Sequence, residues 1–438
     1  MSFDQLRQMN GRVCSCGKVH RHTVSAVRSG KGALNELPSL LLARGIKKPF
    51  LVCDQTTLRV AGERVRDVLT KAGLICALYA LPLDKPLPDE TSAGSLMMHF
   101  DVSCDGIVGI GSGVVNDLCK LLASVTGRDY AVVGTAPSMD GYASDTSAML
   151  RDGLKVSLNT HCPDVIIGDT DILKTAPDVM LQAGLGDMIA KYIGLAEWKI
   201  SNVINGESYC PEIASLVKSA LDACVNNADG LLKRDDEAVK AVFDGLVISG
   251  VAMTYAGSSR PASGVEHYVS HLWDMRGEGL GKPRALHGIQ CALGTLETLR
   301  RYELLRERTP DREKAFAYAR AFDFDALSEQ LRQTVGRGAE SMIEAEKTDR
   351  KYDPEKHAAR FERIVEKWDE ILKIMKEDLP SYAETEALLR RVGAPLTPVD
   401  AGLEDNMAEI FPLTKDVRNK YILTSLLWDL GLLDEIRP

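Results

Sequence analysis

The chain has 438 residues, of which 45% are hydrophobic and 26% are charged, the balance of an ordinary globular protein. Its 53 basic and 62 acidic residues give a net charge of −9, which argues against a nucleic acid or an anionic membrane as partner. The length predicts two or three domains with large cores that need no disulfide staples.

The N-terminal segment and the cysteines favour a cytoplasmic protein. The opening MSFDQLRQMNGRVCSC lacks the apolar run of a signal peptide. No run of about 18 apolar residues occurs, so we expect no membrane-spanning helix. The ten cysteines are too sparse for a disulfide scaffold, and Cys53 and Cys119 lie in apolar segments, so we expect reduced thiols.

The first 175 residues alternate short apolar runs with amphipathic stretches. The runs predict strands at 50–53, 75–79, 106–110, 130–133 and 165–168, and the stretches predict helices such as 58–72 and 114–124. This alternation is typical of a mostly parallel sheet with helices on its faces. We therefore expect residues 1–175 to form an α/β nucleotide-binding domain.

Beyond residue 175 the pattern becomes helical. Thr175 suits a helix N-cap, and Pro177 suits the first turn. Helical spacing then covers 187–200, 233–254, 286–305, 310–333, 354–377 and 415–430. The mixed charges of 344–376 predict a solvated helix face. We expect residues 176–438 to form an all-helical domain.

A glycine turn joins the strand at 106–110 to the next helix. Gly109-Ile-Gly111-Ser-Gly113 precedes Val114-Val-Asn-Asp117, and glycines at such a junction let backbone N–H groups approach a diphosphate. The spacing is GxGxG rather than GxGxxG, and no acidic residue follows about 20 positions later, so a tight turn without a ligand stays an alternative.

Two further candidate ligand-binding segments follow strands of this region. Asp54 follows the strand at 50–53, where it either accepts hydrogen bonds from a ribose or caps the next helix. The strand at 130–133 leads into a loop with small hydroxyl side chains, GTAPSMDGYAS, over residues 134–144. Such loops bind ligands in open α/β sheets, although Ser138 and Asp140 are also common turn residues.

One aspartate and three histidines form a candidate metal site. Asp187 ends the sequence GLGD, and His267 and His271 are four residues apart, a spacing that places both on one helix face. His287 follows in LHG. These side chains suit Zn²⁺, Ni²⁺ or Fe²⁺, and three protein ligands would leave one position for a substrate oxygen.

A second group of metal-binding residue types lies near the N-terminus. Cys14, Cys16, His20 and His22 fall within nine residues and have spacings that could bind zinc. No second CxxC or HxxxH pair follows them, so an exposed hairpin is the favoured interpretation.

Five segments between residues 109 and 288, GSGVVNDLCK, GTAPSMDGYAS, GLGDMIAKY, SSRPASGVEHYVSH and LHG, occur in the order typical of one family. On these motifs the chain resembles the sn-glycerol-1-phosphate dehydrogenases, especially the bacterial ones. They belong to a superfamily with the dehydroquinate synthases, glycerol dehydrogenases and iron-containing alcohol dehydrogenases. The turn reads GIGSG where many members have GGG.

The resemblance implies both an architecture and a reaction. The expected architecture is an N-terminal α/β domain and a C-terminal helical domain that binds metal and substrate, with the active site in the cleft between them and a homodimer as the assembly. The expected reaction, from phospholipid biosynthesis, reduces dihydroxyacetone phosphate to sn-glycerol 1-phosphate with NADH or NADPH.

The resemblance also assigns residues. Asp187, His267 and His287 match the ligands of one divalent ion, Zn²⁺ or Ni²⁺. Asp140, Asp187 and His271 match substrate-contacting positions, and Asp187 and His271 are the expected catalytic residues. The positions that match cofactor contacts are Asp54, Gly111, Gly113, Val114, Val115, Asn116, Asp117, Thr135, Ala136, Pro137, Ser138 and Ser144. Lys155 and Arg260 are candidates for the substrate phosphate, which needs cationic or amide donors.

In the mechanism that we infer, the metal polarises the C2 carbonyl of the substrate and the nicotinamide supplies hydride, while His271 relays a proton or holds a substrate hydroxyl. A glycerol or other small-alcohol dehydrogenase would share the metal ligands without a phosphate pocket. A dehydroquinate synthase would show no net consumption of NADH. A catalytically silent binder of nucleotides or sugar phosphates is disfavoured by the intact metal set. Asp54 favours NAD over NADP.

Overall fold

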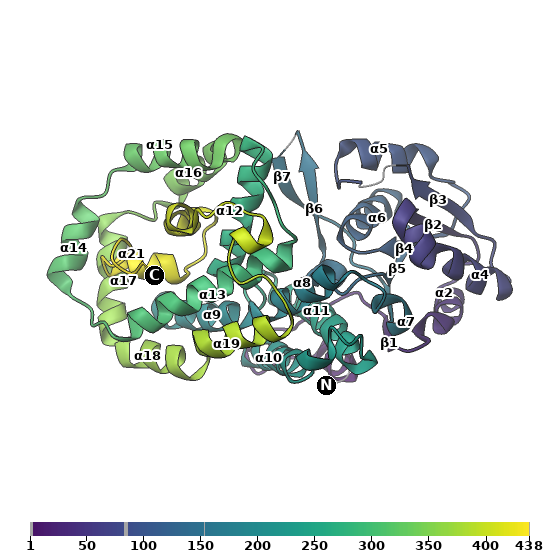
Figure 1. The fold of residues 1–438 in the computed structure, drawn as a ribbon, viewed down its shortest axis with the longest axis horizontal. Helices are drawn as coiled ribbons and strands as arrows, with labels where there is room; N and C mark the ends of the chain where they lie inside the picture. Colours follow the sequence, from purple (N-terminus) through teal and green to yellow (C-terminus); the bar gives the residue numbers. More distant parts are fainter. Residues whose placement is uncertain (1–2, 83–85, 153, 438) are drawn as a thin grey trace. The chain divides into compact units, whose positions relative to one another are not determined.

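The computed structural model describes residues 3–82, 86–152 and 154–437, and the chain folds into two compact units (Figure 1). Unit 1 consists of Met1–Met188 and Ser215–Ser258, and unit 2 consists of Ile189–Ala214 and Ser259–Pro438. The chain therefore leaves unit 1, returns to it and leaves again. This division differs from the expected boundary at residue 175, because the long helix that ends at Ala256 packs in unit 1.

A six-stranded parallel sheet forms the centre of unit 1, which confirms the expected fold class. Its spatial order is β1 (Ala26–Gly30), β8 (Val165–Asp169), β5 (Asp129–Gly134), β4 (Gly106–Gly111), β2 (Pro49–Asp54) and β3 (Ala77–Leu81). Because the strands are parallel, β2, β4 and β5 end at the same edge of the sheet. That edge therefore carries Asp54, the glycine turn and the start of the 134–144 loop.

Both faces of the sheet are covered by helices. On one face, Leu41 of α2 (Leu37–Ala43) and Leu69 of α4 (Glu63–Lys71) belong to a buried cluster with the sheet residues. On the other, Phe243 of α11 (Asp236–Ala256) contacts the sheet at Gly134 and Gly168, where a Cβ would lie 2.8 and 2.2 Å from its ring. The absence of side chains at these two glycines therefore lets α11 approach the sheet closely.

Shorter elements complete unit 1. Its remaining helical elements are α1 (Phe3–Met9), η1 (Ala33–Glu36), α3 (Gln55–Thr57), η2 (Leu58–Gly62), α5 (Glu90–His99), α6 (Gly113–Thr126), η3 (Asp140–Ala143), α7 (Thr170–Leu173) and η4 (Ala228–Gly230). Two helices cross a unit boundary, α8 (Asp178–Ile189) and α10 (Pro211–Asn226).

Among the described residues, α11 is the one helix with the length and apolar composition to cross a membrane. Its apolar window is 72% buried inside the structure, and the contact of Phe243 with the sheet contributes to that burial. The composition of α11 is therefore explained as that of a core helix.

The structure contains three strands that the sequence pattern did not predict. Strand β1 is half-buried along its whole length, so it lacks the alternation by which strands are recognised. The other two, β6 (Thr146–Arg151) and β7 (Leu154–Asn159), form an antiparallel pair. In addition, β3 begins two residues later than expected.

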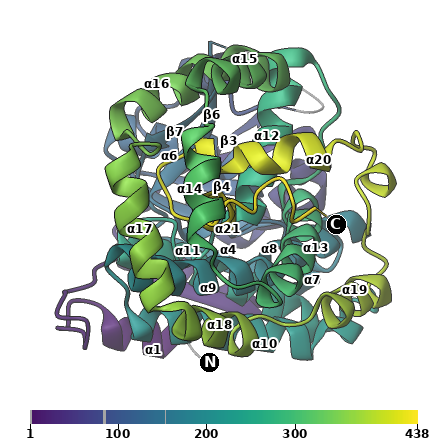
Figure 2. The ribbon, with the colours of Figure 1, turned by 90° about the vertical axis from the view of Figure 1, so that its left-hand side faces the viewer.

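Unit 2 is helical throughout its described residues (Figure 2). Its main helices are α9 (Lys191–Asn205), α12 (Val265–Leu280), α13 (His287–Arg306), α14 (Arg312–Arg320), α15 (Phe324–Val335), α16 (Ala339–Asp349), α17 (Pro354–Glu366), α18 (Trp368–Glu377), α19 (Tyr382–Arg391) and α21 (Leu423–Asp429). The short elements are η5 (Gly336–Gly338), η6 (Val399–Ala401), α20 (Met407–Ile410) and η7 (Phe411–Asp416).

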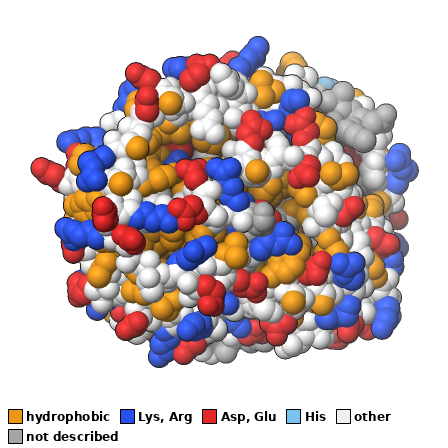
Figure 3. Space-filling model, turned by 60° about the vertical axis from the view of Figure 1, so that its left-hand side comes forward, with side chains coloured by type: hydrophobic (Ala, Val, Ile, Leu, Met, Phe, Trp, Pro, Cys, Tyr) orange, Lys and Arg blue, Asp and Glu red, His pale blue; other side chains and the backbone are white. Residues whose placement is uncertain are grey.

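Three expected helices of unit 2 are shorter or divided. The stretch 310–333 becomes α14 and α15, because Asp323 caps a new helix through hydrogen bonds from the N–H groups of Asp325 and Ala326. The stretch 354–377 divides at Lys367 into α17 and α18. Of 415–430, only α21 is α-helical. Acidic and basic side chains are interspersed on the face drawn in Figure 3, as expected for solvated helices.

Candidate active site

The turn between β4 and α6 has no room for a side chain at Gly111. A Cβ there would lie 2.6 Å from the Cβ of Val115, so this part of the turn is lined by backbone. Helix α6 starts at Gly113, and the first N–H groups of a helix have no partner within it. Gly113, Val114 and Val115 therefore offer backbone donors and the positive end of the helix dipole to an anion such as a diphosphate.

The loop after β5 is fixed beside this turn. Thr135 N donates to the carbonyl oxygen of Gly111 at 3.2 Å, and Ser138 N donates to that of Ala136 at 3.0 Å. The buried hydroxyl of Tyr142 also donates to Ala136 O, at 2.7 Å. These bonds hold the expected cofactor-contacting residues of the loop next to the glycine turn before any ligand binds.

Two of the expected cofactor residues on α6, Asn116 and Asp117, also help to support this loop. The side chain of Asn116 donates to Gly141 O at 3.0 Å and is fully buried. Lys120 Nζ donates to Ser144 Oγ at 3.1 Å and pairs with Asp117 at 2.9 Å. Burial raises the pKa of Asp117, while the Lys120 ammonium opposes this shift. The sequence analysis missed Lys120, although its spacing of three residues from Asp117 was a usable signal.

Asp54 acts as a helix cap. Its Oδ1 accepts hydrogen bonds from Thr56 N at 2.8 Å and Thr57 N at 2.7 Å, and Thr57 Oγ1 accepts from Asp54 N in return. This is a capping box, one of the two interpretations that the sequence left open. Both capping bonds use the same oxygen, so the cap by itself does not occupy the other carboxylate oxygen.

Helix α8 brings Asp187 to the same part of unit 1. The fully buried carboxylate of Asp187 accepts from Asp140 N at 2.9 Å through Oδ2, and Asp140 Oδ2 accepts from Ser249 Oγ at 2.9 Å. One turn earlier, a Cβ at Gly184 would lie 1.8 Å from the carbonyl oxygen of Pro137. The GLGD motif therefore combines a carboxylate with a glycine that lets α8 contact the cofactor loop.

In unit 2, helices α12 and α13 bring the expected histidines together. The ring centroids of His267 and His287 are 5.1 Å apart, and those of His271 and His287 are 6.4 Å apart. Cys291 joins them one turn after His287, and the donor atoms of His267, His287 and Cys291 all lie within 4.8 Å of one another. The sequence analysis missed Cys291, which its four-residue spacing from His287 could have revealed.

Neighbouring side chains orient both imidazoles. His267 Nδ1 donates to Glu266 Oε1 at 2.6 Å, and the same oxygen accepts from Gly264 N at 2.8 Å. His287 Nδ1 lies 2.9 Å from Ser270 Oγ. In each ring Nε2 is the remaining nitrogen, the arrangement usual for a metal-binding histidine whose other nitrogen is held by a supporting group. The two histidines therefore fit a divalent ion such as Zn²⁺ or Ni²⁺.

Cys291 adds a sulfur atom to this group. Its Sγ lies 3.6 Å from His287 Nε2. Burial raises the pKa of Cys291, but the His267 and His287 imidazoles outweigh this effect, so the pKa lies below that of an ordinary thiol. A thiolate beside two imidazoles would strengthen the preference for zinc over harder cations.

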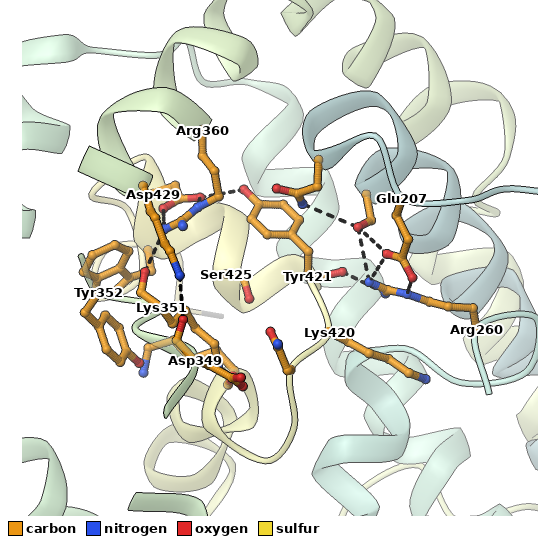
Figure 4. A pocket seen from close by; sticks show the side chains of 16 residues that line it. Glu207, Arg260, Asp349, Lys351, Tyr352, Arg360, Lys420, Tyr421, Ser425 and Asp429 are labelled. Carbon is orange, nitrogen blue, oxygen red and sulfur yellow. Dashed lines mark hydrogen bonds and ion pairs between the residues drawn. The ribbon is translucent and has the colours of Figure 1, made fainter. Parts of the chain in front are cut away.

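Unit 2 also contains a partly open cavity of about 330 Å³ (Figure 4). Its acidic lining residues are Glu207, Asp349 and Asp429, and its basic ones are Arg260, Lys351, Lys356, Arg360, Lys415 and Lys420. Arg260 donates to both oxygens of Glu207, at 2.7 and 2.5 Å, and to Tyr421 O at 2.9 Å. Its guanidinium group is thus committed to the wall of this cavity, which makes it a poorer phosphate candidate than the sequence indicated. Lys155, the other candidate, is exposed on β7.

Lys420 is a half-buried cation of the cavity wall. Its Nζ donates to Ser259 Oγ at 2.7 Å and to Ser263 Oγ at 2.9 Å, and it points away from the paired Arg360 and Asp429 (Figure 4). Burial lowers the pKa of Lys420 to about 7, and the nearby Arg260 and Arg418 add to this effect. Lys420 therefore titrates near neutral pH.

Comparison with known families supports the expected ancestry. Residues 28–177 match the family model of iron-containing alcohol dehydrogenases. A relative named glycerol-1-phosphate dehydrogenase [NAD(P)+] from Halalkalibacterium halodurans is 33% identical over 65% of this chain and 72% of its own length. Similarly named relatives are 31% identical in Bacillus subtilis, over 72% of this chain and 82% of the relative, and 33% identical in Methanosarcina acetivorans, over 61% and 73%.

Solved structures with the same fold are more distant in sequence. Glycerol dehydrogenase from Schizosaccharomyces pombe superposes with a TM-score of 0.61 at 14% identity, covering 95% of this chain and 90% of that one. A 1,3-propanediol oxidoreductase superposes with a TM-score of 0.61 at 14% identity, covering 95% and 99%. At these identities the likeness establishes the fold alone.

Proposed function

Because this chain belongs to the glycerol-1-phosphate dehydrogenase family, we propose that it reduces dihydroxyacetone phosphate to sn-glycerol 1-phosphate with NADH or NADPH. The observation that carries this proposal is the pair of oriented imidazoles, His267 and His287, in a chain that also carries a glycine turn at the start of a helix. An α/β sheet edge for a dinucleotide and borderline ligands for a cation are the two components of a metal-assisted hydride transfer.

Asp187, His267 and His287 would hold the divalent ion. Asp187 lies four residues before α9, and α9 packs on both α12 and α13, which carry the two histidines. Asp140 N donates to Oδ2 of Asp187, and this bond fixes the carboxylate in place. Zn²⁺ and Ni²⁺ both suit this set, and a Cys291 thiolate nearby would favour zinc.

A bound divalent ion would polarise the C2 carbonyl of the substrate, and a bound nicotinamide would supply the hydride. Gly111, Gly113 and the first turn of α6 would bind the diphosphate, and residues 135–138 would position the nicotinamide end. The free oxygen of Asp54 would accept from the adenosine ribose, which favours NADH. Asn116, Asp117 and Ser144 would keep this surface in place.

The substrate would contact Asp140, Asp187 and His271. Asp140 already shares hydrogen bonds with Asp187 and Ser249, so its position is fixed before substrate binds. His271 lies one turn after His267 and beside the His287 ring, where a neutral imidazole can pass a proton to the developing alkoxide or hold a substrate hydroxyl. Lys155 remains our candidate for the phosphate group. We further propose a cytoplasmic homodimer that serves phospholipid biosynthesis, as the family likeness suggests.

The alternative is a glycerol or small-alcohol dehydrogenase, which the shared fold of the solved structures keeps open. Oxidation of NADH and of NADPH should be followed with dihydroxyacetone phosphate and with dihydroxyacetone in parallel, and the product's enantiomer identified. We expect the phosphorylated substrate to be preferred by at least 10²-fold in kcat/KM, a difference of roughly 3 kcal/mol in transition-state binding. Equal rates with both substrates would favour the alternative.

A further inference from the structure

The N-terminal hairpin at residues 13–19 forms a tight turn around two cysteines. Val13 and Val19 pair as an antiparallel bridge, and Cys14 N donates to Lys18 O at 2.8 Å. Gly17 follows Cys16 with a φ of +81°, a conformation that favours glycine, and its N–H donates to Cys14 O at 2.9 Å. The backbone of this Cys-Ser-Cys-Gly turn thus holds the two thiols close together.

The exposure of the two valines in this hairpin is the reverse of what the hydrophobic effect favours. Val13 is 68% exposed and Val19 is 46% exposed, whereas Cys14 and His20 are only 7% and 3% exposed. A hairpin of this sequence would gain more by turning its valines inward, since burying a valine contributes about 1.5–3 kcal/mol. An additional interaction of the cysteine and histidine side chains would stabilise the observed orientation.

The orientation of His20 identifies that interaction. His20 Nδ1 lies 2.8 Å from the carbonyl oxygen of Tyr255, and a carbonyl only accepts, so Nδ1 carries the proton. In the neutral ring, Nε2 then holds the lone pair, and it lies 3.3 Å from Cys16 Sγ. A backbone carbonyl that fixes the tautomer is the usual support of a metal-binding histidine.

We propose that Cys14, Cys16 and His20 bind a structural zinc ion. The donor atoms Cys14 Sγ, Cys16 Sγ and His20 Nε2 all lie within 4.8 Å of one another. In a tetrahedral zinc site, bonds of about 2.0–2.3 Å put neighbouring ligand atoms about 3.5–3.8 Å apart, so a small contraction would bring these three donors into three of the four tetrahedral positions. The exposed hairpin expected from the sequence is thus present, but its Cys14 and His20 side chains are buried.

Such an ion would fasten the N-terminal segment to the core helix α11. Tyr255, whose carbonyl holds His20, lies in the last turn of α11, and its hydroxyl donates to Leu6 O in α1 at 2.7 Å. Gly11 N also donates to His20 O at 2.8 Å. Through these contacts a zinc ion at the hairpin would hold residues 3–22 against α11, in a role separate from catalysis.

The first test is a count of metal per chain in the full-length protein. Elemental analysis of the wild type is compared with the double variant Cys14→Ser/Cys16→Ser and with Cys76→Ser, a matched control at a partly exposed cysteine of unit 1. We expect the double variant to lose one equivalent of zinc and to keep the metal of the histidine site, and the control to lose none. A double variant with the wild-type zinc content would overturn the proposal.

The second test does not depend on the folding of that variant. Cobalt-substituted protein carrying Cys291→Ser, which removes the only cysteine of the histidine site, should still show thiolate-to-cobalt absorption. The absence of that absorption would refute a zinc site at the hairpin. An absorption intensity that corresponds to three thiolates rather than two would also support the site. The variant Cys210→Ser would then test whether the third thiolate comes from Cys210, the residue before α10. His267→Ala leaves the hairpin intact, so failure of the proposed function and failure of this proposal remain distinguishable.

Discussion

Replacement of Gly184 by alanine should separate α8 from the cofactor loop. The new Cβ would lie 1.8 Å from Pro137 O, whereas an unstrained carbon-to-oxygen contact is about 3.3 Å, so helix and loop must part by about 1.5 Å. The loop cannot yield freely, because Thr135 and Ala136 are bonded to the glycine turn and to Tyr142. Overpacking of this kind costs about 1–3 kcal/mol of stability.

The same displacement should affect function, because Asp187 follows Gly184 by one turn and residues 135–138 are the proposed nicotinamide contacts. A misplacement of about 1 Å reduces rates by on the order of 10²-fold. We expect a higher KM for NADH, a lower kcat and a lower denaturation midpoint for Gly184→Ala, measured by steady-state kinetics and urea denaturation.

A matched control is available in the same unit. Gly94 lies inside helix α5, where a Cβ would meet nothing within 4 Å. Gly94→Ala should therefore stabilise the protein by about 0.5–1 kcal/mol and leave its kinetics unchanged. If Gly184→Ala behaved like Gly94→Ala, the contact between α8 and the loop would not be the constraint that we describe.

Four further substitutions test other parts of the structure. His267→Ala should lose the catalytic metal and turnover together, and full activity without that metal would contradict the Lewis-acid role. His271→Ala should lower kcat while metal analysis still finds the ion; loss of the ion would make His271 a ligand. Asp54→Ala removes a capping box and should cost about 0.5–2 kcal/mol in urea denaturation, together with a higher KM for NADH if the ribose contact exists. For Lys420, burial lowers the pKa to about 7 from 10.5, so the unfolded state binds more protons between these values and the free energy of unfolding rises with pH across that window. Lys420→Met should therefore stabilise the protein more at about pH 6 than at about pH 10, and a difference that does not vary with pH would refute this.

Local patterns predicted the elements whose environment is uniform. The buried strands β2, β4, β5 and β8 are continuous apolar runs, because a parallel sheet covered on both faces needs apolar residues throughout. Strand β1 at the sheet edge is half-buried and reads AVRSG, so nothing in its own sequence distinguishes it from a loop. Its pairing with β8, more than 130 residues away, is a property of the tertiary fold.

The candidate site also depends on tertiary packing that the sequence pattern does not reveal. The i, i+4 spacing correctly grouped His267 with His271 on one face, but it could not show that His287 and Cys291 lie beside them, because that depends on how α12 packs on α13. The roles of Glu266 and Ser270 as supports of the imidazoles also depend on this packing. For Arg260 the sequence indicated a phosphate contact, whereas the structure pairs this cation of a family motif with Glu207.

The return of the chain to unit 1 at Ser215–Ser258 has a consequence for biosynthesis. Phe243 covers the sheet at Gly134 and Gly168, so this part of the sheet stays uncovered until α11 has left the ribosome. By then about three-fifths of the polypeptide has been made, including the 189–214 excursion that belongs to the other unit. A fragment that stops at residue 188 would expose this apolar surface to water, and nascent chains of that length are the ones that we expect to need a chaperone.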